Sequence, residues 1–169
     1  MNGISLTKML FGACLVGSVL NGNQSFSQDS LSCLAIVGKC VQGENDVREY
    51  KVVLYDGNEK INSKEVIKER DFAFVLKKNK SYSIQITKSG YLNRLISVDT
   101  HLPANVSISP VFRFVFEIEM KKQLKKSASD DDALDFPLVL ISYNSELDRF
   151  DYNRKYTAKI KEDIRSIGR

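Results

Sequence analysis

The sequence predicts an all-β protein, mainly an antiparallel sandwich, and three observations support this fold class. From residue 33 to residue 120, apolar and polar side chains alternate with a period of two, which is typical of half-buried strands. The alternating runs follow one another at intervals of about 8–12 residues with turn-forming residues between them, as in sandwiches and barrels. No strand pattern alternates with a helical pattern, so a parallel sheet is not expected.

The composition of the 169-residue chain is that of one folded domain, with or without an appendage. Its 43% apolar and 27% charged residues exclude a disordered or collagen-like chain. The 25 Lys and Arg residues against 21 Asp and Glu residues leave a net charge of +4. These basic residues form no clear stripe, so the charge gives no reason to expect a nucleic acid as partner.

Residues 1–27 are expected to form a secretory signal peptide. Lys8 precedes an apolar run over residues 9–20, and small residues stand before the expected cleavage site at Gln28. As a helix the run spans about 18 Å, which is too short for the ~30 Å core of a bilayer. We therefore expect an exported protein with no transmembrane span after removal of the signal.

Two cysteines of the mature chain, Cys33 and Cys40, fall in one predicted strand. Their spacing places them roughly 23 Å apart on opposite faces of that strand, too far for a disulfide. We expect both thiols to be buried as small apolar groups. A lipid anchor on Cys14 or Cys33 fits the surrounding residues poorly.

The first six strands are expected from period-two runs at 33–41, 50–56, 60–67, 72–76, 81–87 and 91–99. An Asp-Gly-Asn turn at residues 56–58 predicts a hairpin between the second and third strands. The third run is polar, as in an edge strand. The fifth alternates strictly, with Tyr82, Ile84 and Ile86 facing inward.

The residues after this unit predict a C-terminal extension over 101–169, with strands at 111–120 and 138–143, a charged loop at 121–136 and a helix at 155–167. In the first of these strands one face carries only large apolar side chains, which we expect in the core: Phe112, Phe114, Phe116, Ile118 and Met120. The helix carries an apolar stripe of Tyr156, Ile160, Ile164 and Ile167. The extension either lengthens one sheet or forms a separate unit covered by the helix.

The runs at 36–38, 50–54, 71–76, 82–91 and 96–100 together resemble the carboxypeptidase regulatory-like domain. This resemblance implies a seven-stranded, transthyretin-like or immunoglobulin-like antiparallel sandwich over residues 28–100, related to collagen-adhesin B-type repeats. The segments 112–120, 136–143 and 149–156 are similar to the tails of small exported Gram-negative envelope proteins. The resemblance implies a location and an architecture, and no activity.

The sequence contains no constellation that points to catalysis, and we expect no catalytic, cofactor or metal site. His101 is the single histidine, whereas zinc sites and the transthyretin-like hydroxyisourate hydrolases use several. The G-x-S-x-G elbow of serine hydrolases is absent. The acidic run 130–132 with Asp135 lacks the spacing of a calcium loop, and an exposed sheet face explains Glu117 and Glu119.

These observations favour a non-enzymatic exported protein of the periplasm, outer membrane or cell surface, acting as a structural or protein-binding module. Its expected partner is an envelope or outer-membrane protein. The alternative is a carbohydrate- or metal-binding accessory protein, or a hydrolase with scattered carboxylates. Tyr143, Phe150 and Tyr152 are suited to anchor a partner, unless these aromatic rings attach the extension to the sandwich.

Overall fold

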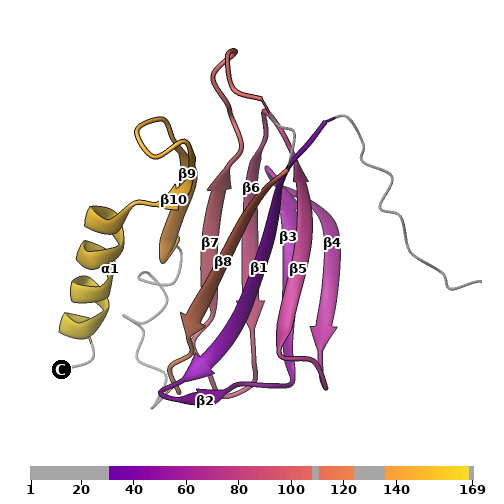
Figure 1. Cartoon of the computed structure of the whole chain (residues 1–169). Coiled ribbons are helices and arrows are strands. Elements are labelled where there is room, and N and C mark those ends of the chain that lie inside the picture. Colours follow the sequence, from indigo (N-terminus) through magenta and orange to yellow (C-terminus); the bar gives the residue numbers. More distant parts are fainter. Residues whose placement is uncertain (1–30, 108–110, 124–135, 168–169) are drawn as a thin grey trace, which may run out of the picture.

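The computed structural model describes residues 31–107, 111–123 and 136–167 of the chain. Its strands form two sheets that lie face to face as a sandwich and do not close into a barrel (Figure 1). The mainly β sandwich that the sequence predicts is therefore confirmed.

The smaller sheet is built around a long central strand. Its four strands are β1 (Ser32–Gln42), β2 (Asn45–Asp46), β5 (Asp71–Lys77) and β8 (Phe112–Glu119). β1 pairs with β5 along one edge and with β8 along the other, and β2 pairs with the end of β1. β5 and β8 are thus joined through β1.

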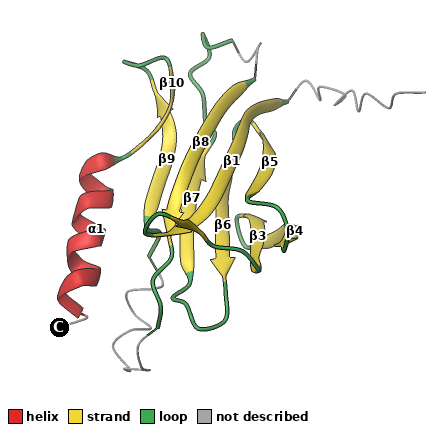
Figure 2. Ribbon diagram, turned by 60° about the horizontal axis from the view of Figure 1, so that its bottom comes forward, coloured by secondary structure: helices red, strands yellow, loops and turns green. Residues whose placement is uncertain are grey.

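The larger sheet contains β3 (Tyr50–Asp56), β4 (Glu59–Val66), β6 (Ser81–Thr87), β7 (Arg94–Asp99), β9 (Val139–Asn144) and β10 (Arg149–Tyr152). Their spatial order is β10-β9-β7-β6-β3-β4. A single described helix, α1 (Arg154–Ile167), follows β10 and stands beside β9 at one side of the sandwich (Figure 2).

The alternation read from the sequence is confirmed in the strands with the strictest pattern. β5 buries Phe72, Phe74 and Leu76, and β6 buries every second residue in the same way. The predicted hairpin joins β3 to β4, with Gly57 at a φ of 58°, a conformation that costs glycine little. β4 is an edge strand and exposes all its residues except Val66.

The antiparallel prediction is wrong for two strand pairs, so both sheets are mixed. β8 lies parallel to β1, from Leu34 opposite Phe112 to Val41 opposite Glu119. β9 lies parallel to β7. In both cases the preceding strand along the chain belongs to the opposite sheet. A tight hairpin forces neighbouring strands to be antiparallel, whereas a crossing between sheets leaves the direction free.

The strands of the extension are divided between the two sheets, an arrangement that neither alternative from the sequence describes. β8 joins the smaller sheet, whereas β9 and β10 lengthen the larger one. Ile118, Met120, Ile141 and Phe150 are buried in the same core cluster as the earlier strands. The strands β8, β9 and β10 therefore contribute directly to the core of the sandwich.

Several predicted features fall outside the described residues. These are the expected signal peptide at 1–27, most of the charged loop at 124–135, and the side chains of Ile164 and Ile167 on the helical stripe. Tyr156 and Ile160 of that stripe are half-buried.

Both cysteines of the described chain are free and fully buried, as expected. Burial raises the pKa of Cys33 to about 11 and that of Cys40 to about 12. The prediction that they occupy opposite faces is wrong, because both belong to one core cluster. A shift in the pairing register between Ser32 and Leu34 interrupts the alternation at Cys33.

The centre of the core depends on a glycine in the middle of β1. A Cβ atom at Gly38 would lie 2.4 Å from Cζ of Phe72 and 2.8 Å from Cζ of Phe116. These two rings belong to β5 and β8, and their centroids are 6.0 Å apart in an edge-to-face contact. Because Gly38 has no side chain, the rings of Phe72 and Phe116 can pack against each other over β1.

We predict that Gly38→Ala lowers the free energy of unfolding by about 1–3 kcal/mol, because the added methyl group displaces two packed rings. Urea unfolding measures this change. Phe116→Leu in the Gly38→Ala background should recover part of the loss, since the smaller side chain makes room. Additive losses in the double variant would contradict the proposed clash.

Candidate functional site

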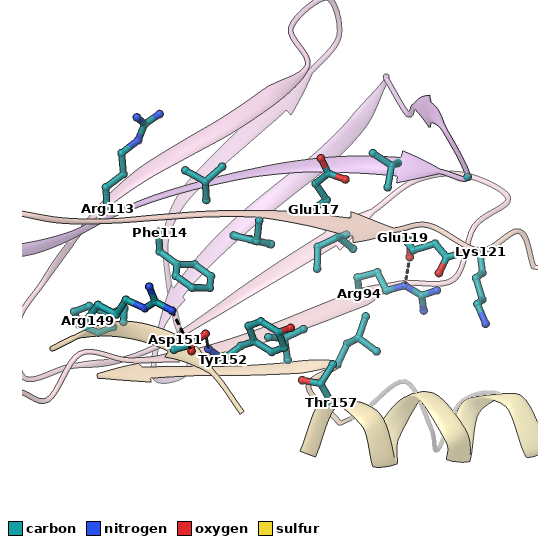
Figure 3. Close-up of a pocket in the computed structure, with 18 residues that line it drawn as sticks. Arg94, Arg113, Phe114, Glu117, Glu119, Lys121, Arg149, Asp151, Tyr152 and Thr157 are labelled. Atoms are coloured by element: carbon teal, nitrogen blue, oxygen red, sulfur yellow. Dashed lines mark hydrogen bonds and ion pairs between the residues drawn. The ribbon is translucent and has the colours of Figure 1, made fainter. Parts of the chain in front are cut away.

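A groove of about 810 Å³ lies between β8 of the smaller sheet and β9 and β10 of the larger sheet (Figure 3). β8 contributes every residue from Arg113 to Glu119 to its wall. The opposite wall includes residues 138–139 and 149–152, and Thr157 of α1. The groove therefore lies at the side of the sandwich where β8 faces β9 and β10, the last two strands at one edge of the larger sheet.

Both faces of β8 reach the groove because this strand is an edge. Among the described residues β8 pairs with β1 alone, so its second edge carries no neighbouring strand. Phe114 points from β8 toward β10, whereas Arg113 and Glu117 point to the other side of the strand (Figure 3). An unpaired strand edge offers a row of backbone N–H and C=O groups to an incoming chain.

Three aromatic rings connect the two sheets next to the groove, and one of them, Phe150, also lines it. The ring of Phe112 on β8 lies 5.7 Å from that of Tyr143 on β9 and 5.6 Å from that of Phe150 on β10. The rings of Tyr143 and Phe150 are 5.9 Å apart. This aromatic cluster attaches the last two strands to β8.

The three predicted partner anchors differ in their surroundings. Phe150 is buried and Tyr143 is half-buried, and both belong to the aromatic cluster. Tyr152 is 40% exposed, lines the groove, and lies below the guanidinium of Arg154 at 5.8 Å. The alternative of attachment to the sandwich therefore describes Phe150 and Tyr143, while Tyr152 is free to meet a partner.

One end of the groove contains a buried arginine. Arg94 on β7 is only 3% exposed, and its Nε donates a hydrogen bond to the backbone oxygen of Glu119 at 3.0 Å. Nη1 donates a long hydrogen bond of 3.5 Å to the backbone oxygen of Asn93. Burial lowers the pKa of this guanidinium, but arginine stays charged in proteins. Among the described residues, no carboxylate forms an ion pair with it within 4.0 Å.

A buried hydroxyl without a partner lies in the wall of the same groove. Asn153 caps α1, its side chain accepting a hydrogen bond from the backbone N–H of Tyr156 at 3.0 Å. The following residue, Thr157, is 6% exposed, and its Oγ1 has no hydrogen-bond partner among the described residues. Buried polar groups are nearly always paired, so this hydroxyl is suited to form a hydrogen bond with a group that enters the groove.

The carboxylates and the histidine considered from the sequence do not assemble into a reactive site. His101 is exposed, and its Nδ1 lies 2.5 Å from a carboxylate oxygen of Asp99. Glu117 forms an ion pair of 2.9 Å with Lys39, and Glu119 is exposed. The described groove instead combines an apolar floor with a cationic end, which suits binding of an extended chain.

Arg94 and Thr157 were not among the residues that the sequence analysis selected. A signal for Arg94 exists, because it shares the inward parity of Ile96 and Val98, where a charged residue is unusual. Thr157 carries no such signal. Its position beside the groove follows from the parallel pairing of β9 with β7 and from the path of the chain into α1.

We predict that Phe150→Ala lowers the free energy of unfolding by about 3–5 kcal/mol, because it removes a buried ring that connects the sheets. Tyr152→Ala should cost less than about 1 kcal/mol, since its side chain is 40% exposed and lies outside the aromatic cluster. Chemical denaturation of both variants measures the difference. Equal losses would show that Tyr152 also belongs to the attachment of the tail.

No protein-family model matches this chain, and no curated protein is significantly similar to it. The part of the chain that the structure describes contains no helix long and apolar enough to cross a membrane. In the same residues, no three His, Cys, Asp or Glu side chains gather as metal ligands.

Proposed function

We propose that this protein is an exported, non-enzymatic module of a bacterial cell envelope that binds an extended segment of a partner protein. The binding surface is the groove along the free edge of β8. The partner is an envelope or outer-membrane protein, and its segment lies beside β8 as an added strand.

The single observation that carries this proposal is the continuous lining of the groove by β8. Seven consecutive residues, Arg113 to Glu119, face a space of about 810 Å³. At about 3.3 Å per residue this edge spans roughly 20 Å, the length of a six- or seven-residue strand. Added strands obtain affinity from backbone hydrogen bonds and specificity from pockets for alternate side chains.

The chemistry of the groove supports binding more than catalysis. Its inward side chains from β8 are Phe114, Phe116 and Ile118, which offer contact area and no reactive group. The two acidic residues of β8 are exposed, and Glu117 is paired with Lys39. Apolar contacts along a strand edge hold a peptide without any requirement for a nucleophile or a base.

Export is supported by the sequence of residues 1–27 and by the resemblance of the following residues to envelope domains. The surroundings of Cys33 bear on the mode of attachment. Its side chain is fully buried in the core next to Leu34 and Ile36. A lipid on this sulfur would have to displace core packing, which favours an unlipidated mature chain.

We predict that the mature protein begins at Gln28 and is recovered from the cell envelope or periplasm. Intact-mass measurement of the native protein from each cell fraction tests this. The control is a double variant that combines Lys8→Glu with an aspartate inside the apolar run 9–20, because these changes should prevent cleavage of the signal peptide. A full-length mass in the envelope fraction contradicts cleavage. A lipid-sized increment on Cys33 contradicts the proposed unlipidated form.

We predict that a photo-crosslinking amino acid at Val115 captures the partner, whereas the same group at Val75 does not. Both valines lie on the smaller sheet and are similarly exposed, at 60% and 51%, but only Val115 lines the groove. Irradiation of the intact envelope followed by immunoblotting measures the adducts. Equal capture at both positions would place the contact elsewhere on the sheet.

A further inference from the structure

Resting on the proposed function, we infer that the groove recognises the free C-terminus of its partner, whose α-carboxylate binds Arg94 and Thr157. The partner strand then runs parallel to β8. Three properties of the groove support this inference: a permanent buried charge, an orphan hydroxyl, and the position of the guanidinium relative to the backbone of β8.

The buried guanidinium of Arg94 is suited to bind an anionic group. Arg94 can donate five hydrogen bonds, and the described residues accept two, both through backbone oxygens. The carboxylate of Glu119 acts on this guanidinium through its charge alone and forms no ion pair with it within 4.0 Å among the described residues. A planar carboxylate from a ligand can still match the remaining donors in a bidentate arrangement. Lys121 lines the same end of the groove and adds positive charge (Figure 3).

The orphan hydroxyl is a second and independent indication. Oγ1 of Thr157 is buried in a wall of the groove, and no group in the described part of the chain forms a hydrogen bond with it. A hydroxyl donates one hydrogen bond, and a carboxylate oxygen accepts it readily. Arg94 on β7 and Thr157 on α1 line the same groove, although β9 separates their two elements.

The position of the guanidinium selects a main-chain carboxylate over a side-chain one. Nε of Arg94 is bonded to the backbone oxygen of Glu119, so the guanidinium lies level with the backbone at the end of β8. The backbone of a strand added beside β8 would pass close to the guanidinium of Arg94 at the end of β8. Its last residue therefore presents the α-carboxylate there. Since β8 also ends at this point, the added strand runs in the same direction.

The probe is a library of seven-residue peptides with free C-termini, from which binders to the full mature protein are selected. The best binder is then compared with its C-terminal amide by calorimetry. We expect the acid to bind at least about ten-fold more tightly, because hydrogen bonds to charged groups are strong. Free acid and amide of equal affinity would overturn the carboxylate site while leaving the peptide groove in place.

Variants of the protein assign the preference to residues. Thr157→Val keeps the shape of the side chain and removes a hydroxyl that has no partner, so the fold should be unaffected. It is expected to reduce the acid-to-amide ratio about three-fold. Arg94→Gln should bring the ratio close to one, with thermal unfolding as a check on its folding.

Arg149→Gln is the matched control, since Arg149 lines the groove away from Arg94 and is 3.9 Å from Asp151. The acid-to-amide ratio should be unchanged in this variant. An equal loss in Arg149→Gln would mean unspecific attraction of anions and would overturn the site. If no library peptide binds, the proposed function itself fails.

Discussion

The structure depends on the central position of β1 in the smaller sheet. This strand pairs with β5 on one side, with β8 on the other, and with β2 at its end. Because Gly38 has no side chain, Phe72 and Phe116 from the two neighbouring strands meet across it. The packing of both outer strands, and through β8 one wall of the groove, therefore follows from a single position on β1.

The groove exists because β8 is packed against β9 and β10 at its start and not at its end. Phe112, Tyr143 and Phe150 join the start of β8 to β9 and β10, and no described ring contact joins the end of β8 to these two strands. There the inward position on β7 is occupied by Arg94 instead of an apolar residue. A charge at this position weakens the core and keeps the end of the groove polar. Natural proteins break a packing rule in this manner mainly where function requires it.

The prediction from sequence succeeded where local chemistry decides the structure. The turn at Gly57, the inward faces of β5 and β6, and the exposed edge strand β4 were all correctly expected. The prediction failed where the structure depends on pairing between strands that are distant in the sequence. The parallel pairings of β8 and β9, and the position of Cys33 in the same core as Cys40, depend on register between remote strands.

The sequence by itself determined that the chain forms alternating strands with a large aromatic core, because side-chain parity is a local property of each strand. Only the tertiary structure decided which strand edges pair and which one stays free. Neither the division of the tail between two sheets nor the position of Arg94 and Thr157 in one groove is signalled by the local sequence. The physical reason is that a strand edge offers the same backbone groups whatever its sequence, so its partner is chosen by the packing of the whole sandwich.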